Sequence, residues 1–447
     1  MMRMRILILF LLLTASVLEA CAAGGAAGNV NPSSAGMKDP LGDDIALRMI
    51  RAYGGTNEVL PPIVVLEAEK SGDIGSPSIT VEFDISSTSI PNVYARIIHC
   101  SADWTPDEDG FLSDVNNRTT LIDWKIAPER ATYSRYRGHF TLPNQQTRIR
   151  FSGNWVVRIY DIDTDSLLGE TRFFAVDTRA TIRMNFMTDF YQPRYRVSGT
   201  AYTIETMVRD LTARLLTTNL HTVVLYRNHR WFDPFIASEK IRPLRNPGSI
   251  SADVLGMVQA GKIFRLSQIP AQNEYRVLDL TDPGRFPSTG QPIPLGLSDI
   301  RRNGMFMQRA DDGAMISRSV SSVNDEFIPV EFLLDPTPGG ASDDDIFVSG
   351  SFNNWKPDRN WLMYFDSANR LYRLRQWVRR GRHNYLYANG RIGADSDAAL
   401  EINYEEFEGN TAAANNTFIA FAYYRELDYG GYDGIVAVGT GTMYGNK

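Results

Sequence analysis

The stretch from Asn92 to Val176 constrains the possible folds of this chain more than any other part of its sequence. It opens with the run Val93 to Cys100, and after Arg148 to Tyr160 a short polar turn leads to a return run, Thr171 to Val176. β-Branched and aromatic runs bounded by Asp, Ser and Gly clusters are typical of antiparallel strands and hairpins. Nothing in the stretch looks like a reaction centre, which favours a function carried by the surfaces of a β-sandwich.

A clean strand pattern also precedes this stretch. From Ile79 to Ile85 the odd positions are apolar and the even positions are polar, as in a strand with one face on a core. With this segment included, we count about seven strands between residues 60 and 176. That number, together with short turns, predicts an immunoglobulin-like sandwich, and we assign residues 45–176 to this first domain.

The rest of the chain predicts two more β domains. Residues 177–325 contain strand-like runs and a Pro- and Gly-rich loop, which indicate a second, looser β domain. Residues 326–447 contain further period-two runs, such as Leu371 to Val378, which predict a C-terminal β-sandwich. No long segment shows the 3.6-residue period of a helix. The expected fold class is therefore all-β, with tandem immunoglobulin-like β-sandwich domains.

Residues 1–20 have the organisation of a secretory signal peptide. Arg3 and Arg5 precede the apolar run Ile6 to Leu13, which is well short of the ~20 apolar residues that a membrane-spanning helix needs. Residues 21–44 begin with a tract of Gly, Ala, Asn and Ser, which predicts a flexible tether. The chain is therefore expected to be exported.

The end of the signal peptide suggests an attachment to the membrane. Leu18-Glu19-Ala20-Cys21 resembles a bacterial lipoprotein cleavage box, although Glu19 is unusual at its position. Cys21 is thus a candidate for lipidation. The alternative is cleavage close to Cys21 without acylation.

Charge and spacing argue against nucleic-acid and metal binding. The chain has 46 basic and 52 acidic residues and no basic run. The acids Asp161, Asp163 and Asp165 resemble the start of a calcium loop, but Ser166 replaces the Gly of the sixth position and Arg172 replaces the Glu of the twelfth. We therefore interpret this segment as a polar hairpin turn.

Catalytic chemistry is not indicated either. The five histidines show no paired ligand spacing, and no phosphate-binding or nucleophile motif occurs. Cys100 lies in an expected strand and is most simply a small buried apolar side chain. We expect no enzyme activity, no cofactor, no metal ion and no small-molecule substrate.

Aromatic residues are the remaining signal. Most of the tryptophans are expected in cores, but Trp104, Trp231 and Trp355 lie next to expected turns and are candidate contacts for a partner or a glycan. The segment Gly350 to Trp355 also resembles the start of starch- and glycogen-binding sandwich modules. An exposed platform of Trp355 with Trp361 or Trp377 would favour glycan binding, whereas a buried Trp355 would make the segment a packing feature.

Several segments together resemble the plug protein family of the type IX secretion system of Bacteroidetes. Their order and spacing carry the resemblance, which runs from about residue 45 to residue 445. The segments are Ile97 to Trp104, Phe140 to Asn144, Ser152 to Trp155, Asn228 to Trp231, Asn273 to Arg276, Val348 to Trp355 and Tyr423 to Arg425.

The resemblance implies a structural function. Members of the family bind the periplasmic mouth of a large outer-membrane β-barrel translocon and close it when no cargo passes. This chain is accordingly expected to be a non-enzymatic plug at the periplasmic face of the outer membrane, with that barrel as its partner. The alternative is a glycan-binding lipoprotein of the cell envelope, and an enzyme, such as a hydrolase, is a third hypothesis.

Overall fold

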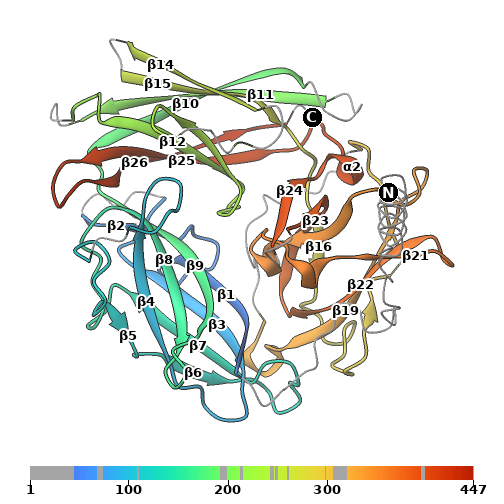
Figure 1. Cartoon of the computed structure of the whole chain (residues 1–447). Coiled ribbons are helices and arrows are strands. Elements are labelled where there is room, and N and C mark those ends of the chain that lie inside the picture. The colour runs from blue at the N-terminus through green and yellow to red at the C-terminus, as the bar shows by residue number, and fades with distance from the viewer. Residues whose placement is uncertain are drawn as a thin grey trace, which may run out of the picture. The chain divides into compact units, whose positions relative to one another are not determined.

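The computed structural model describes residues 45–67, 74–107, 110–191, 199–211, 215–241, 246, 250–258, 261–296, 298–305, 320–393 and 398–445. The predicted signal peptide, the predicted tether and Cys21 lie outside these residues. The described chain consists mainly of antiparallel strands, so the predicted all-β class with β-sandwiches is confirmed (Figure 1). No helix within the described ranges has both the length and the apolar character needed to cross a membrane.

The first sandwich follows the predicted strands closely. One sheet has the order β1-β3-β7-β6, formed by Ala46–Gly54, Ile79–Ser86, Tyr136–Leu142 and Asp123–Ile126. The facing strands have the order β9-β8-β4-β5, formed by Leu167–Val176, Gly153–Asp161, Val93–Cys100 and Arg118–Thr119, and β2 (Ile63–Val65) pairs with β9. The core between them contains the odd-numbered apolar residues of β3 together with Trp155.

The middle sandwich combines two distant parts of the chain. One sheet has the order β10-β11-β15-β14, formed by Ala180–Tyr191, Gly199–Asp210, Gly261–Pro270 and Ser251–Val258. The facing strands have the order β13-β12-β25-β26, formed by Pro234–Ser238, Leu220–Arg227, Asn416–Glu426 and Tyr432–Met443. A single bridge, Ile435 to Val176, joins these strands to β9 of the first sandwich.

In sequence, the third sandwich lies between the two parts of the chain that form the middle sandwich. Its first sheet has the order β16-β23-β20, formed by Arg276–Asp279, Arg382–Ile392 and Asp345–Gly350, and β24 (Ala399–Asn403) pairs with β23. Its second sheet has the order β17-β19-β22-β21, formed by Ile293–Pro294, Phe327–Asp335, Leu371–Arg379 and Tyr364–Asp366, and β18 (Asp299–Ile300) pairs with β19. Within the described ranges, the short helices η2 (Ser322–Asn324), η3 (Ser351–Asn353), η4 (Arg359–Trp361) and α2 (Glu405–Glu408) accompany it.

The first sandwich lies within the predicted block 45–176, but strand pairing crosses the boundary between the predicted blocks 177–325 and 326–447. Strands β16 to β18 precede residue 326 and pair within the third sandwich, whereas β25 and β26 follow it and complete the middle sandwich (Figure 1). The sequence pattern locates strands along the chain, but it does not show with which strands they pair. A run that is apolar on both faces, as in β25, can complete any sheet that offers two covered faces.

Strands β12 and β25 bury both of their faces, and this joins the first sandwich to the middle one. On β25, Phe418 and Ala420 point into the core of the middle sandwich, together with Ala422 and Tyr424. The alternate residues Ile419, Phe421 and Tyr423 belong to a separate core that also contains Phe174 and Val176 of β9. The ring of Phe421 stacks on that of Phe174 at a centroid distance of 4.2 Å.

A buried ionic cluster joins the first sandwich to the third. The even-numbered residues of β3 were expected on a polar outer face, but Glu82 and Asp84 are buried because Arg379 of β22 covers them. Arg379 also donates to Asp325 with an Nε–Oδ1 distance of 3.0 Å, and Arg137 donates to Asp84 with an Nε–Oδ1 distance of 2.8 Å. Burial alone would raise the pKa of Glu82, but Arg379 and the neighbouring arginines hold it well below its usual range. The two sandwiches therefore meet through matched charges.

Phe421→Ala tests the shared core. The substitution removes a fully buried ring, so the free energy of unfolding should fall by about 3–5 kcal/mol. Urea unfolding measures this loss. Leu427→Ala, at an exposed residue of the β25–β26 hairpin, is the matched control and should change stability by no more than about 0.5 kcal/mol. Equal effects of the two substitutions would contradict the two-sided burial of β25.

Burial of His383 should make the stability of the folded chain depend on pH. This buried histidine of β23 has its Nε2 2.7 Å from the carbonyl oxygen of Arg379, and burial lowers its pKa from 6.5 to about 4. The unfolded chain then binds a proton that the folded chain does not, so stability is full above pH 6.5 and falls as the pH drops towards 4. His383→Gln should weaken this dependence of the urea midpoint. His229, whose pKa burial also lowers to about 4, keeps part of it. An unchanged pH dependence in the variant would contradict the assignment.

Candidate interaction surface

Of the three tryptophans proposed from the sequence, Trp231 lies in the turn Arg227 to Asp233, which we call the junction turn. Trp355 lies beside Arg230 of this turn, and Trp104 hydrogen-bonds to Tyr226 just before it. The turn connects β12 to β13, and the backbone N–H of Arg230 donates to the carbonyl of Arg227 at 2.9 Å. Its central residues Asn228 and His229 have φ angles of 48° and 60°. Positive φ at both central residues is the conformation of the hairpin turns that match strand twist, and Asn and His tolerate it better than most residues.

Asn228 holds the junction turn against its neighbours. Its Nδ2 donates to the hydroxyl of Tyr275 at 2.9 Å, and its Oδ1 accepts from the backbone N–H of Thr417 at 2.8 Å. The backbone N–H of Asn228 in turn donates to the carbonyl of Thr417. The turn is therefore attached both to the start of β25 and to the segment that leads into the third sandwich.

Trp104 and Trp231 pack around the same two residues of the shared core. Both indole rings contact Phe174, at centroid distances of 5.4 Å and 5.3 Å, and Trp104 Nε1 donates to the hydroxyl of Tyr226 at 2.9 Å. The guanidinium group of Arg172 lies 4.2 Å from the centroid of Trp104. Trp104 is half-buried and Trp231 is only 6% exposed, so their visible role is to pack the first and middle sandwiches together.

Trp355 is buried in the third sandwich. Its side chain is 3% exposed, and its ring contacts Tyr275 at a centroid distance of 4.9 Å. Trp377 is also buried, and the half-buried Trp361 stacks on Phe352 at 4.6 Å. The exposed tryptophan platform that glycan binding requires is therefore not formed by these residues, and the Gly350 to Trp355 segment is a packing feature.

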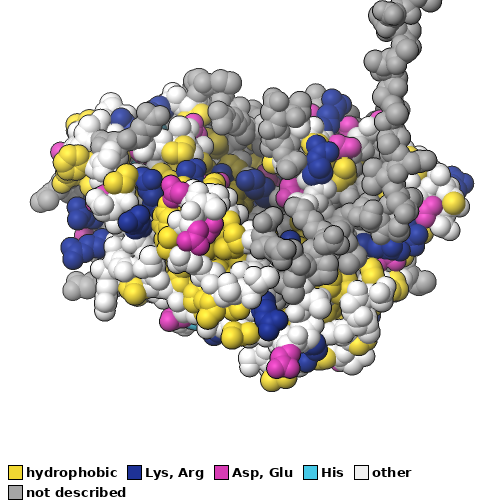
Figure 2. Space-filling view, turned by 60° about the horizontal axis from the view of Figure 1, so that its bottom comes forward, with side chains coloured by type: hydrophobic (Ala, Val, Ile, Leu, Met, Phe, Trp, Pro, Cys, Tyr) yellow, Lys and Arg dark blue, Asp and Glu magenta, His cyan; other side chains and the backbone are white. Residues whose placement is uncertain are grey.

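Exposed apolar side chains indicate a different surface. On the face shown in Figure 2, apolar side chains form several separate groups with charged side chains between them. The aromatic residues Phe111 and Tyr429 are largely exposed, at 70% and 53%. Their rings lie 6.0 Å apart, and Phe151 lies 5.1 Å from Tyr429. Solvent-exposed aromatic groups of this kind are common in protein interfaces.

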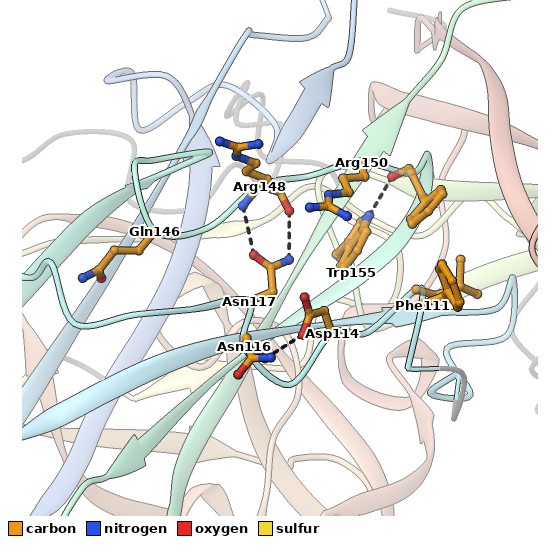
Figure 3. Close-up of a pocket in the computed structure, with 10 residues that line it drawn as sticks. Phe111, Asp114, Asn116, Asn117, Gln146, Arg148, Arg150 and Trp155 are labelled. Carbon is orange, nitrogen blue, oxygen red and sulfur yellow. Dashed lines mark hydrogen bonds between the residues drawn. The ribbon is translucent and has the colours of Figure 1, made fainter.

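Phe111 and Phe151 line a cavity that we call the aromatic hollow, and Tyr429 contacts both of their rings. The hollow has a volume of about 150 Å³, and it lies where the loops around β4 and β8 meet (Figure 3). Leu112 and Trp155 are its buried apolar lining residues. Its other lining residues are Phe111, Asp114, Asn116, Asn117, Gln146, Arg148, Arg150 and Phe151.

Hydrogen bonds fix the two loops of the hollow relative to each other. Asn117 Oδ1 accepts from the backbone N–H of Arg148 at 2.9 Å, and Asn117 Nδ2 donates to the carbonyl of Arg148 at 2.8 Å (Figure 3). Asp114 accepts from the backbone N–H of Asn116 at 2.8 Å, and Trp155 Nε1 donates to the carbonyl of Phe151 at 3.1 Å. The hollow is thus a preformed feature of the first sandwich.

The charge of the hollow is mainly positive. In Figure 3, Arg148 and Arg150 lie on one side of the cavity and Asp114 on the other. The exposed guanidinium groups of Arg148 and Arg150 form no ion pair with any residue that the structure describes. Aromatic rings beside available arginines can hold a protein segment that carries an apolar side chain and oxygen acceptors.

Sequence reasoning missed this surface, although a local signal existed. Phe111 follows an acidic loop that ends in Gly110, and Tyr429 precedes Gly430 and Gly431. Large aromatic residues within turn-forming segments lie outside the alternating strand patterns that assign apolar residues to a core.

The acids Asp161, Asp163 and Asp165 form a turn, as interpreted from the sequence. Asp161 accepts from the hydroxyl of Thr164 at 2.6 Å, and Asp165 accepts from the hydroxyl of Tyr94 at 2.6 Å. Their carboxylates therefore serve separate local hydrogen bonds. Within the described ranges, no group of three or more potential metal ligands comes together.

Cys100 behaves as the expected small buried side chain. It is fully buried, and burial raises the pKa of its thiol to about 12. The thiol is therefore neutral at physiological pH and is a poor nucleophile. Its neighbour His99 is also buried and contacts Asp107 through Nδ1 and the carbonyl of Ser152 through Nε2 at 3.0 Å.

Comparisons with known proteins support the interpretation of the first sandwich. Residues 47–177 match the model of the type 9 secretion system plug protein 1st domain. A crystal structure of a hypothetical protein from Parabacteroides merdae is similar over 91% of this chain and 99% of that chain, with a TM-score of 0.65 and 18% identity. At this identity the likeness shows a shared fold alone. No curated protein matches the chain.

The matched residues coincide with the first sandwich, from β1 to the end of β9. A plug domain indicates a role in type IX secretion, an association with its machinery and a location in the cell envelope. The resemblance inferred from the sequence is thereby confirmed for residues 47–177, which match the first domain of type IX secretion plug proteins.

Proposed function

We propose that this chain is a non-enzymatic plug that binds and closes the periplasmic side of the outer-membrane barrel translocon of type IX secretion. The match of residues 47–177 to the first domain of plug proteins is the observation that carries the proposal. The neutral, buried Cys100 thiol and the locally bonded acids of the Asp161 to Asp165 turn are consistent with a function that involves no chemistry.

The aromatic hollow is the contact that we assign to the barrel. It lies on the plug domain itself, and it combines exposed aromatic rings with two arginines that have no acidic partner among the described residues. A specific interface buries about 1,600 Å² in total, and a few aromatic or arginine residues near its centre supply most of the binding energy. The hollow provides such a centre, and the surrounding loops provide the rest of the area.

Attachment to the outer membrane is a second part of the proposal. Acylation of Cys21 would hold the chain beside the barrel, and the tether of residues 21–44 would give it reach. Mass spectrometry of the mature N-terminus should show a lipid-modified Cys21, and Cys21→Ser should release the protein from the membrane fraction. An unmodified mature N-terminus would remove this part of the proposal and leave the plug itself untouched.

Phe111→Asp combined with Tyr429→Asp tests the contact. The substitutions place two carboxylates where aromatic rings would be buried, so binding should weaken by more than about thirtyfold, equivalent to about 2 kcal/mol. Affinity capture from detergent-solubilised envelopes, followed by mass spectrometry, measures how much barrel protein accompanies the chain. Ile90→Asp is the matched control, because Ile90 is also exposed but lies near the opposite end of β4.

Permeability provides the functional readout. Deletion of the chain should let a large antibiotic cross the outer membrane, and the Phe111/Tyr429 double variant should fail to restore the barrier that the Ile90→Asp variant restores. A free monomer with no captured barrel, together with unchanged permeability on deletion, would refute the plug. Capture of the barrel by the double variant at the wild-type level would refute the contact alone.

A further inference from the structure

Two fully buried arginines lie in the junction turn, and neither the fold nor the proposed function explains their charges. Arg227 ends β12 and Arg230 follows it by three residues, and both side chains are completely shielded from solvent. None of the three guanidinium nitrogens of Arg227 has a hydrogen-bond partner among the described residues, and those of Arg230 have only an ion pair with Asp233. A buried cation without acceptors is rare, because charged groups in protein interiors are normally paired and hydrogen-bonded.

Arg227 is surrounded by aromatic rings. Its guanidinium carbon lies 5.1 Å from the ring centroid of Phe235 and 5.4 Å from that of Phe418. No carboxylate of the described chain forms an ion pair with it. Cation–π contacts recover less free energy than the burial of a charge costs. The rings orient the guanidinium group but do not neutralise it.

Arg230 has one partial counter-charge. Its Nη2 lies 2.9 Å from an oxygen of Asp233, whose side chain is partly exposed. The rings of Tyr404 and Trp355 lie 4.9 Å and 5.7 Å from its guanidinium carbon. The two cations and this single carboxylate leave a net charge of about +1 in the protein interior.

The two arginines affect each other electrostatically. Burial lowers the pKa of Arg227 to about 10, and the charge of Arg230 acts in the same direction. Arg227 still remains protonated at neutral pH. A neutral hydrogen-bond acceptor would satisfy some of the N–H groups but would leave the excess charge, whereas an anion would do both.

We propose that Arg227 and Arg230 form a buried binding site for a small oxyanion of the sulfate or phosphate class. The planar guanidinium groups offer paired N–H donors, which suit the oxygen atoms of such an anion. Because Arg227 lies over Phe418 of the middle sandwich and Arg230 over Trp355 of the third, the anion stabilises the connection between these two sandwiches. It exchanges when the junction opens, since the site is closed in the folded chain.

Thermal unfolding of the full chain after refolding from urea tests the site. Sodium gluconate serves as a bulky reference anion, and sulfate or inorganic phosphate replaces it at constant ionic strength. Above the dissociation constant, each tenfold rise in the binding anion should multiply the folded-to-unfolded ratio tenfold. Comparison of sulfate with phosphate shows which oxyanion the site prefers.

Matched variants separate the site from the general effect of salts on stability. Arg391→Met, at a largely exposed arginine, should respond to the anions as the wild-type chain does. Arg227→Met removes one charge at similar volume and should lose the specific response, while becoming more stable than the wild-type chain in gluconate alone. An equal anion response of Arg227→Met and Arg391→Met would overturn the proposal.

A crystal structure of the wild-type chain refolded with selenate gives a second readout that needs no folded variant. An anomalous difference peak between the guanidinium groups of Arg227 and Arg230 is expected. Water alone at both guanidinium groups would overturn the proposal, whatever the behaviour of Arg227→Met. The proposed plug function makes no prediction for either measurement, so the two proposals fail independently.

Discussion

The architecture depends on the burial of β12 and β25 on both faces. One face of each strand contributes to the core of the middle sandwich, and the other contributes to the core shared with β9 of the first sandwich. This arrangement requires an uninterrupted apolar run, which Phe418 to Tyr424 supplies. It also explains why β25 and β26, which follow the strands of the third sandwich in sequence, belong to the middle sandwich. The junction turn follows β12 directly, so its position is a consequence of the same packing.

The other contacts between sandwiches use charge instead of apolar area. Glu82 and Asp84 of β3 form ion pairs with Arg379 of β22. These ion pairs offset the desolvation cost of burying the charged groups. At the junction turn the charges are not matched, because Arg227 has no carboxylate partner in the described chain. The charges between β3 and β22 are therefore balanced by other groups of the protein, whereas the charge of Arg227 at the junction turn is not. This contrast is the physical reason for assigning an anion to the junction.

Much of the fold could be predicted from local patterns, and the parts that could not are those set by long-range pairing. The period-two pattern from Ile79 to Ile85 predicted β3, and the run Val93 to Cys100 predicted β4. The same pattern suggested a polar outer face for β3, which the third sandwich covers. No local signal at Phe418 to Tyr424 shows that these residues pair with β12. The sequence does not show which aromatic residues are exposed. Trp231 and Trp355 are buried, whereas Phe111 and Tyr429 are exposed.

In the proposed complex the plug domain contacts the secretion barrel through the aromatic hollow, so residue 111 lies at the interface. A photoreactive amino acid at position 111 or, for comparison, at position 90 probes this contact in living cells. A covalent adduct with the barrel protein is expected from position 111 and none from position 90. Absence of a barrel adduct at position 111, or equal adducts from both positions, would contradict this contact.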